Sequence, residues 1–286
     1  MTPYTRAFPL VEATISVINV GDLILKLAEE MNVPESEWRP RYASLFEQAA
    51  LFPSQCIHIA LPGASILVDA SNYSAFAPPG SPYLPPNYQP PPGMISQLLE
   101  RNVRPTDITH LVITHAHFDH YAGVTTEQDG HYVPSFPNAR CFLGKADWEH
   151  PDTQEALQDI NSRDSRTLGV LRRQGLLELV EKDLDLAPGV RIIAAPGESP
   201  GHQLVRVQSQ GQTLYCLGDL YHHTVEVEQP AWMSAWADVD TNLASRHALA
   251  QAALAENALL IAAHIPTIGR LERTPAGVRW TEAQLL

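Results

Sequence analysis

The sequence predicts an α+β protein built as a single domain. Runs of β-branched and apolar residues recur along the 286 residues and indicate strands, and segments with apolar residues at helical spacing lie between them. No internal repeat and no obvious linker divides the chain, and 44% hydrophobic residues are enough for a large core. We therefore expect one unit over residues 1–286, with an N-terminal extension at 1–50 and a proline-rich loop at 78–92.

Three strands and three helices are expected in the first hundred residues. The strands are expected at 13–22, 56–60 and 65–69, and the helices at 23–31, 42–51 and 94–102. The chain around 38–40 is expected to be irregular, and 21–22 is expected to form a turn. Pro62-Gly63 predicts the turn of a hairpin between the second and third strands. His58 alternates with apolar residues there, which favours a packed or surface histidine over a metal ligand.

The segment 78–92 holds eight prolines together with Tyr83 and Tyr88. Proline fixes φ and removes a backbone donor, so this segment is poorly suited to the interior of a helix or a sheet. We expect a polyproline-like loop that serves as a connector, as a lid over a site or as a dimer contact.

The rest of the chain predicts a regular succession of strands and helices. Strands are expected at 108–114, 139–144, 190–195, 204–207, 213–219 and 259–264, followed by a β tail at 271–286. Helices are expected at 145–150, 168–179 and 244–257, the last of them rich in alanine. Gln210-Gly211 predicts a hairpin turn between two of the strands.

The composition argues against several classes of protein. The net charge is −13, from 19 basic and 32 acidic residues, and no Lys/Arg-rich stretch is present, so we expect no binding to a nucleic-acid backbone. Cys56, Cys141 and Cys216 lie far apart in apolar runs, which predicts buried free thiols. The first residues lack a signal-peptide layout and no apolar run reaches about 18 residues, so we expect no membrane span and a cytoplasmic location.

Four potential metal ligands lie within six residues directly after the apolar run 108–114. They are His115, His117, Asp119 and His120. A tight turn at the end of a strand can aim several side chains at one point. Imidazoles mixed with a carboxylate favour zinc, iron or manganese over calcium or magnesium, which prefer oxygen ligands. The alternative interpretation is a solvated histidine-rich turn.

Three more residues of the same types follow apolar runs farther along the chain. His202 follows a strand and a Pro/Gly turn, Asp219 follows a strand that ends in glycine, and His264 follows a strand directly. A single residue of this kind has a structural explanation, as a packed histidine or a helix cap. Four separate strand ends that all carry metal-ligating residues favour a shared metal site.

The pattern His115-x-His117-x-Asp119-His120, followed by the three later residues, resembles the metallo-β-lactamase-fold hydrolases from about residue 57 to about 270. Residues 199–202 are similar to the family's Thr-Pro-Gly-His turn, with serine in first place. Asp69 matches an early strand-end aspartate, but Ala-Ser follows it where the family has Thr-Gly, so we expect Asp69 to brace the site. The resemblance implies a four-layer αββα sandwich with two metal ions at one edge of the sheets.

Carried over to this chain, the resemblance implies one metal ion held by His115, His117 and His202. It implies a second ion held by Asp119, His120 and His264, with Asp219 bridging the two. Zinc is the first expectation, and iron, cobalt or manganese fit the same mixed nitrogen and oxygen ligands.

Two metal ions about 3.5–4 Å apart can share a hydroxide that acts as the nucleophile, while one ion polarises a carbonyl or phosphoryl oxygen. Asp119 has in addition the chemistry to pass a proton to the leaving group. The sequence therefore predicts a dinuclear hydrolase that attacks an ester-like carbonyl.

Residues 218–223 and 261–270 resemble a subgroup of lactonases and methyl-parathion-type hydrolases. The resemblance implies a lactone substrate and a homodimer. His222 lies where some lactonases have a tyrosine that contacts the substrate carbonyl, so we expect His222 to bind a substrate oxygen or to support a ligand. The substrate pocket is expected to be apolar and to be formed by the 78–92 loop, Phe118 and Trp148.

Other functions fit parts of the same pattern. The nearest alternative is hydrolysis of an organophosphate triester or an aryl ester, and a β-lactamase has the same ligand motif. An iron-dependent redox protein of the same fold is a less favoured alternative, since no flavin-binding segment follows. Nucleic-acid processing conflicts with the acidic charge, and the intact ligand set disfavours a non-catalytic metal-binding protein.

Overall fold

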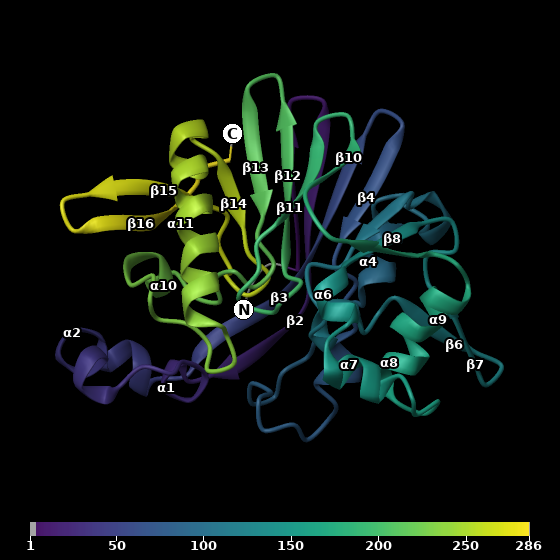
Figure 1. Cartoon of the computed structure of the whole chain (residues 1–286), viewed down its shortest axis with the longest axis horizontal. Coiled ribbons are helices and arrows are strands. Elements are labelled where there is room, and N and C mark those ends of the chain that lie inside the picture. Colours follow the sequence, from purple (N-terminus) through teal and green to yellow (C-terminus); the bar gives the residue numbers. More distant parts are fainter. Residues whose placement is uncertain (1–3, 286) are drawn as a thin grey trace.

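Two large sheets stacked face to face form the centre of the molecule, and helices cover their outer faces (Figure 1). The structure is a computed structural model that describes residues 4–285. Each of the two sheets has seven strands, and a separate pair of strands lies outside them. This is the four-layer αββα sandwich that the resemblance implied, so the predicted fold class is confirmed.

The first sheet has the order β1-β2-β3-β4-β5-β8-β9. Its strands are β1 (Thr5–Leu10), β2 (Ala13–Leu25), β3 (Ala50–Leu61), β4 (Ala64–Val68), β5 (His110–Val112), β8 (Arg140–Gly144) and β9 (Leu177–Val180). The first four strands pair antiparallel, whereas β4, β5, β8 and β9 pair parallel. Parallel strands end at the same edge, so the turns after β4 and β5 lie side by side.

The second sheet follows the chain order from β10 to β16. Its strands are β10 (Leu184–Ala187), β11 (Val190–Ala194), β12 (Gln203–Ser209), β13 (Gln212–Cys216), β14 (Leu259–Ile261), β15 (Gly269–Thr274) and β16 (Gly277–Glu282). All neighbours pair antiparallel except β13 and β14, which pair parallel. The carboxyl ends of β11, β13 and β14 therefore lie at one edge. The outlying hairpin consists of β6 (Thr125–Gln128) and β7 (His131–Pro134).

Most helices are short and lie in the connections between strands. They are α1 (Leu27–Glu30), α2 (Glu35–Glu47), α3 (Tyr73–Phe76), α4 (Met94–Glu100), the 3₁₀ turn Pro105–Asp107, α5 (Phe118–Tyr121), α6 (Lys145–Trp148), α7 (Pro151–Ala156), α8 (Arg163–Arg166), α9 (Leu168–Arg173), α10 (Val225–Glu228) and α11 (Val239–Glu256). In the described part of the chain, none of these helices has the length and apolar character needed to cross a bilayer.

Helix α11 is the longest helix, and its sequence explains both of its ends. The Asp238 side chain accepts a hydrogen bond from the Thr241 backbone N–H at 2.9 Å, which caps the first turn. Alanine fills much of the interior and has the highest helix propensity. Asn257 ends the helix with φ of +48°, the left-handed conformation that asparagine tolerates.

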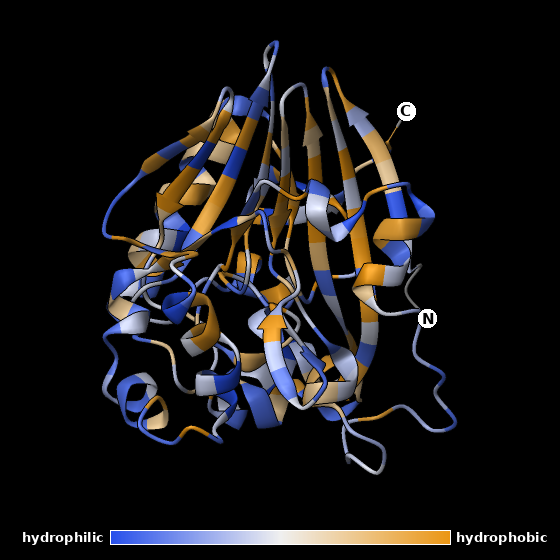
Figure 2. Cartoon of the chain, turned by 90° about the vertical axis from the view of Figure 1, so that its right-hand side faces the viewer, coloured by the Kyte–Doolittle hydropathy of each residue, from blue (hydrophilic) through white to orange (hydrophobic). Residues whose placement is uncertain are grey.

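The apolar core is divided into layers by the two sheets. One cluster fills the space between the sheets, with Ile15 and Ile59 from the first sheet facing Val205 and Leu214 from the second. Another packs α4 and α9 on the outer face of the first sheet, and a third packs α11 on the second. Strand residues alternate between the two faces of a sheet, and Figure 2 shows that hydrophobic residues dominate the central strands.

The structure corrects four of the expected segments. The strand expected to end in a turn at 21–22 continues as β2 to Leu25. Its pairing with β3 shifts by one residue between Asn19 and Gly21, a β-bulge, and then continues to the end of the strand. The helix expected at 23–31 is only the four residues of α1. The segment around 38–40, which was expected to be irregular, lies inside α2. This helix kinks at Tyr42, where the helix expected at 42–51 was to begin, and it ends at Glu47, four residues before the expected end.

The physical reason for the early helix is tertiary packing. Trp38 and Phe46 stack at 5.0 Å between ring centroids, and Phe46 meets Trp232 edge-on at 5.3 Å. This buried aromatic contact holds α2 against its surroundings despite Pro40 in its interior. Local pattern alone cannot show such a contact.

Two further differences concern short strands. The segment expected to be helical over 168–179 is helical only in α9, and its end forms β9, which pairs with β8. Strands β1, β6, β7 and β10 had no expected counterpart. The β tail is confirmed as β15 and β16, and its expected last residue, Leu286, lies outside the described residues. The two predicted hairpin turns are confirmed.

The 78–92 segment contains no helix or strand, as expected. Two tyrosines fasten it to the end of β2: Ile24 N–H donates to the Tyr83 carbonyl at 2.8 Å, and Asp22 N–H donates to the Tyr88 hydroxyl at 2.7 Å. The loop thus supports the end of β2, and a lid or dimer contact stays a prediction.

The predictions for the cysteines and His58 are confirmed. Cys56, Cys141 and Cys216 are free and buried. His58 is buried in β3, and its Nε2 lies 2.8 Å from the Ser65 hydroxyl across the β3–β4 pair.

Candidate metal centre

The turn after β5 carries the four clustered residues, and Asp69 at the end of β4 fixes its position. Asp69 Oδ1 accepts the Thr114 N–H at 2.7 Å, and its Oδ2 accepts the Thr114 hydroxyl at 3.0 Å. The same Oδ2 lies 2.9 Å from His120 Nδ1. Asp69 therefore braces the turn and orients one of its imidazoles, which agrees with the role expected for it.

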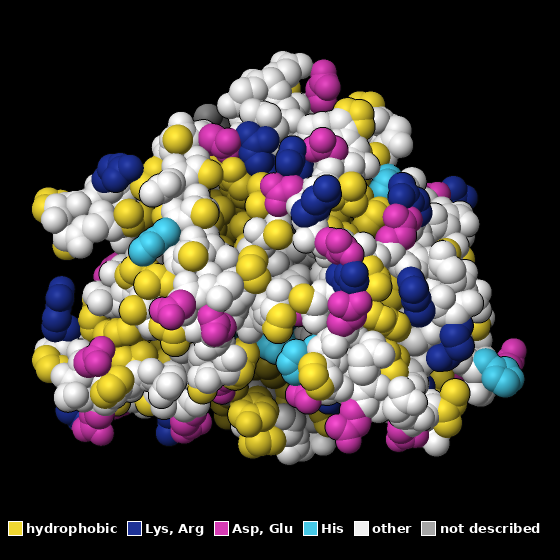
Figure 3. Space-filling view, viewed as in Figure 1, with side chains coloured by type: hydrophobic (Ala, Val, Ile, Leu, Met, Phe, Trp, Pro, Cys, Tyr) yellow, Lys and Arg dark blue, Asp and Glu magenta, His cyan; other side chains and the backbone are white. Residues whose placement is uncertain are grey.

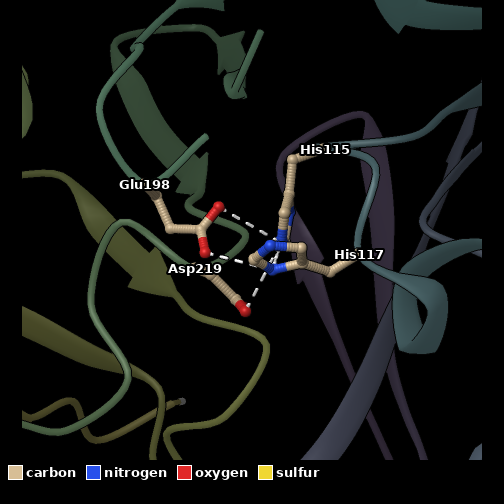
Figure 4. A group of neighbouring side chains, drawn as sticks. All are labelled: His115, His117, Glu198 and Asp219. Atoms are coloured by element: carbon tan, nitrogen blue, oxygen red, sulfur yellow. Dashed lines mark hydrogen bonds and ion pairs between the residues drawn. The ribbon is translucent and has the colours of Figure 1, made fainter. Parts of the chain in front are cut away.

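A first group of donor atoms joins three different loops (Figure 4). It consists of His115, His117, Glu198 and Asp219. His115 Nε2 lies 2.9 Å from His117 Nδ1, 3.3 Å from Glu198 Oε2 and 3.6 Å from Asp219 Oδ2. In Figure 4 the two imidazoles and the two carboxylates point toward one another from opposite sides.

A second group lies directly beside the first and consists of Asp119, His120 and His264. Asp119 Oδ2 lies 3.5 Å from His120 Nε2 and 3.3 Å from His264 Nε2. His264 Nδ1 donates to the Pro53 carbonyl at 2.8 Å, which fixes the ring with Nε2 toward the centre.

Asp219 lies between the two groups. Its Oδ2 is 3.1 to 3.6 Å from four imidazole nitrogens, the Nε2 atoms of His115, His120, His222 and His264. Its Oδ1 is buried without a hydrogen-bond partner among the described residues. A carboxylate shared by both groups is what the predicted bridging position requires.

The backbone before Asp219 admits only a residue without a side chain. Gly218 has φ of +51°, and a Cβ atom there would lie 2.7 Å from Thr114 Cβ and 2.9 Å from His202 Nε2. This close approach brings the loop after β13 against the turn after β5.

His202 is the predicted ligand that the structure places least directly. Its Nδ1 donates to the Ala195 carbonyl at 3.0 Å, and its Nε2 accepts the Asp219 N–H at 3.2 Å. Its ring centroid lies 5.3 Å from that of His115. His202 therefore lies next to the first group, with both ring nitrogens in hydrogen bonds, and it is outside the two groups of close donor atoms.

Glu198 is the residue that the sequence reasoning missed. It lies four residues before His202 in the same turn, and its side chain is 0% exposed. The available signal was an acidic residue in a Pro/Gly turn directly after a strand. Asp147 connects this turn to the turn after β5. Its Oδ2 accepts hydrogen bonds from the Ala116 N–H and from the Ser199 hydroxyl, both at 2.8 Å.

The arrangement fits a metal ion on two grounds. In a tetrahedral site with metal–ligand distances of about 2.0–2.1 Å, the ligand atoms lie about 3.3–3.4 Å from one another. The distances between donor atoms in the first group are close to this, from 2.9 to 3.6 Å. In addition, Glu198 Oε2 and Asp219 Oδ1 are buried oxygens without hydrogen-bond partners in the described part of the chain. Such oxygens are costly unless a cation satisfies them.

Asp119, Asp219 and His115 have the protonation states that a cation needs. Burial raises the pKa of Asp119, but the neighbouring His120 and His264 outweigh it and bring this pKa to about 2. Burial acts on Asp219 in the same way, and the same two imidazoles hold its pKa well below the usual range. Burial lowers the pKa of His115 well below its ordinary value. Ionised carboxylates and a neutral imidazole are the forms that bind metals. For His117, His120 and His264, burial lowers the pKa but the neighbouring carboxylates outweigh it and raise the pKa above its ordinary value, so a cation that binds there must displace protons from these rings.

His222 lies at the edge of the second group. Its ring stacks on that of His264 at 5.8 Å between centroids. Its Nδ1 lies 3.2 Å from the Ser234 hydroxyl, whereas its Nε2 is buried without a hydrogen-bond partner among the described residues. Nε2 also lies 3.2 Å from Asp219 Oδ2. The structure thus places His222 beside Asp219 and His264, and its predicted contact with a substrate oxygen stays a prediction.

A pocket of about 330 Å³ opens onto the centre. Figure 3 shows histidine side chains in a recess bordered by hydrophobic side chains. Its polar lining includes His117, Asp119, Asp219, His222 and His264, and its apolar lining consists of Leu23, Leu25, Leu27, Met31, Phe52 and Trp236.

The expected composition of this pocket was wrong. The 78–92 loop, Phe118 and Trp148 do not line it; both aromatic rings pack instead beside the core on the outer face of the first sheet. The end of β2 and α1 take their place, because β2 continues beyond the expected turn.

Sequence comparison extends this picture. The profile of the metallo-beta-lactamase superfamily matches residues 50–264. An N-acyl homoserine lactonase of Bacillus cereus is 23% identical over 167 residues, which cover 56% of this chain and 57% of that protein. An N-acyl homoserine lactonase of Bacillus thuringiensis is 26% identical over 117 residues, 41% of this chain and 40% of that protein. The chain thus spans about half the length of the curated relatives it matches.

Solved structures share the fold over nearly the whole chain. AidC, a dizinc quorum-quenching lactonase in complex with a product, has a TM-score of 0.78 at 20% identity and covers 99% of this chain and 98% of its own. The hydrolase AbOPH has a TM-score of 0.78 at 17% identity and covers 99% of both chains. Because the family profile covers well over half of the residues, the chain belongs to the metallo-beta-lactamase superfamily.

Proposed function

We propose that this protein is a metal-dependent hydrolase that opens lactones, with two divalent metal ions at the centre. The observation that carries the proposal is the position of the apolar pocket directly over the two groups of donor atoms. A substrate with an apolar chain and a polar ester would place the chain in the pocket and the ester at the centre. Lactonase relatives and the fold shared with AidC support the same substrate class.

We assign the first ion to His115 and His117 and the second to Asp119, His120 and His264. Asp219 is shared. The resemblance implies His202 as the third histidine of the first ion, and the metal content of His202→Gln tests that place. Two ions bound here would supply a water of lowered pKa and a Lewis acid for the carbonyl. Zinc is the first candidate metal, and iron, cobalt or manganese fit the same donors.

Two residues of the pocket would contact the reacting ester. The Asp119 side chain is 25% exposed and lines the pocket, so its carboxylate can carry a proton to the leaving alkoxide. His222 Nε2 has no hydrogen-bond partner among the described residues and can donate to the substrate carbonyl oxygen. Ser234, through its contact with Nδ1, helps hold the ring in place.

The first experiment is hydrolysis of a panel of lactones with acyl chains of increasing length, on protein whose metal content has been measured. We expect KM to fall by up to about fourfold for each methylene that enters the pocket, which corresponds to about 0.8 kcal/mol of apolar burial. The trend should stop when the pocket is filled. No turnover of any lactone by protein with two bound metals would refute the proposed substrate.

An aryl phosphotriester and an aryl ester belong in the same panel, because they are the alternative substrates that the sequence pattern indicates. Faster turnover of either one would replace the lactone proposal. Iron in the purified protein together with oxygen consumption would instead support the redox alternative. The homodimer implied by the resemblance is part of our proposal and can be tested by light scattering.

Replacing His222 with alanine should lower kcat by about a hundredfold to a thousandfold, because one donor to the developing oxyanion is lost. Both metal ions should stay bound, since His222 is outside the two donor groups. Metal analysis beside steady-state kinetics checks both expectations. Loss of a metal ion in His222→Ala would show that His222 is a ligand.

A further inference from the structure

Glu198 belongs to the first donor group, although it is not part of the histidine and aspartate pattern that resembles the metallo-β-lactamase fold. Glu198 is held in the turn between β11 and β12, and its side chain is completely buried. Its Oε1 lies 3.1 Å from His117 Nδ1, and its Oε2 lies 3.3 Å from His115 Nε2 (Figure 4). The two oxygens thus span the pair of imidazoles from one side.

The two oxygens of Glu198 have different surroundings. Oε1 accepts a hydrogen bond from the Trp236 indole N–H at 2.7 Å. Oε2 has no hydrogen-bond partner in the described part of the chain. The hydrogen bond to Trp236 therefore accounts for the burial of only one oxygen. The other oxygen is a buried acceptor directed at the imidazole of His115.

Glu198 also has the charge that a ligand needs. Its side chain is a carboxylate with 0% exposure, and its Oε2 has no hydrogen-bond partner among the described residues. A buried, ionised carboxylate without full pairing is unfavourable unless a cation lies beside it.

His202, four residues later, is less available than Glu198. Its Nε2 already accepts the Asp219 N–H, and its Nδ1 donates to the Ala195 carbonyl. To bind an ion, His202 would have to give up the first of these bonds. Glu198 needs no such change, because its Oε2 has no hydrogen-bond partner among the described residues.

We propose that Glu198 is a direct ligand of the first metal ion, together with His115, His117 and Asp219, and that it takes the place that the resemblance gives to His202. The proposal rests on the proposed function only in requiring a metal ion at this centre. A site with two carboxylates and two imidazoles is richer in oxygen than one with three histidines. It should therefore bind manganese, iron or cobalt better, relative to zinc, than a three-histidine site does.

The test compares Glu198→Gln with the matched control Glu256→Gln in the full-length protein. Glutamine keeps the size and the acceptor for Trp236 but removes the charge. Glu256 is likewise a hydrogen-bonded carboxylate, paired with Arg206 and Tyr215, and lies outside the donor groups. Metal affinity is measured with Zn²⁺ and with Mn²⁺ at buffered free concentrations, by elemental analysis of the equilibrated protein.

We expect Glu198→Gln to weaken one of the two sites at least about tenfold, with a larger loss for Mn²⁺ than for Zn²⁺. Glu256→Gln should match the unchanged protein. The visible spectrum of the Co²⁺-loaded protein should change in Glu198→Gln, because an anionic carboxylate ligand is replaced by a neutral amide. Glu198→Asp should restore part of the affinity, since it keeps the charge.

Two outcomes would overturn the proposal. In the first, Glu198→Gln keeps both ions with unchanged affinity and spectrum while His202→Gln loses one, so the histidine is the ligand. In the second, Glu198→Gln changes only Trp236 fluorescence, so the carboxylate only positions that indole. A protein that holds two ions but opens no lactone would refute the proposed substrate, and the metal measurements would still decide the role of Glu198.

Discussion

Asp219→Asn is expected to lower kcat/KM on the lactone substrate at least about a thousandfold and to release at least one metal ion. The reason is the position of Asp219, whose Oδ2 faces four imidazoles, three of which belong to the two donor groups. Asparagine keeps the shape but removes the negative charge that would hold two cations close together. Elemental analysis and steady-state kinetics on the same preparation measure both effects.

The matched control is Asp185→Asn, which removes a carboxylate paired with Arg191 at the surface. This control should keep both metals and full turnover, because an exposed ion pair contributes little. Thermal unfolding adds a second readout: a metal present at a hundred times its Kd stabilises the fold by about 2.7 kcal/mol. A chelator should therefore lower the Tm of the unchanged protein more than that of Asp219→Asn. Two tightly bound ions and turnover within tenfold in Asp219→Asn would refute the shared-ligand assignment.

Glu226→Gln is expected to destabilise the fold by about 3–5 kcal/mol, because it leaves a buried cation without its partner. The side chains of Glu226 and Arg246 are 0% and 1% exposed, and Arg246 Nη2 donates to Glu226 Oε1 at 2.6 Å. Glu226 Oε2 also accepts the backbone N–H groups of His222 and His223. The ion pair thus holds the segment that carries His222, and chemical denaturation measures the loss.

Two further variants distinguish the cost of an unpaired buried charge from a general loss of stability on substitution. Arg246→Met combined with Glu226→Gln should recover part of the stability, since no unpaired charge is then left inside. Glu178→Gln removes the partner of Arg140 at the surface, where the two side chains are 42% and 61% exposed. We expect that change to cost no more than about 1 kcal/mol. Equal losses in Glu178→Gln and Glu226→Gln would contradict the role of burial.

The same pair predicts a dependence of stability on pH. Burial raises the pKa of Glu226, but the charge of Arg246 and the hydrogen bonds outweigh it and bring the pKa to about 2, below the ordinary value of 4.5. A lowered carboxyl pKa contributes stability that is complete above pH 4.5 and is lost as the pH falls toward 2. The stability difference between the unchanged protein and Glu226→Gln should therefore shrink over that interval. A constant difference would argue against this origin.

The sequence alone determined the sheet-forming runs and most of the residues at the centre. Strands β3, β4, β5, β8 and β11 to β14 follow from apolar, β-branched patterns, and polar ligand types at their ends indicated where the metal centre would form. These features are local, because strand periodicity and the end of a strand are written in adjacent residues. The bracing role of Asp69 also came from its place at a strand end.

Only the tertiary structure decided which other groups meet there. Glu198 joins the first donor group because Asp147 connects its turn to the turn after β5. Glu226 is paired because α10 and α11 bury Arg246 beside it. The pocket is apolar because β2 passes its expected turn. Each of these facts depends on contacts between segments far apart in the chain, and local propensity carries no information about such contacts.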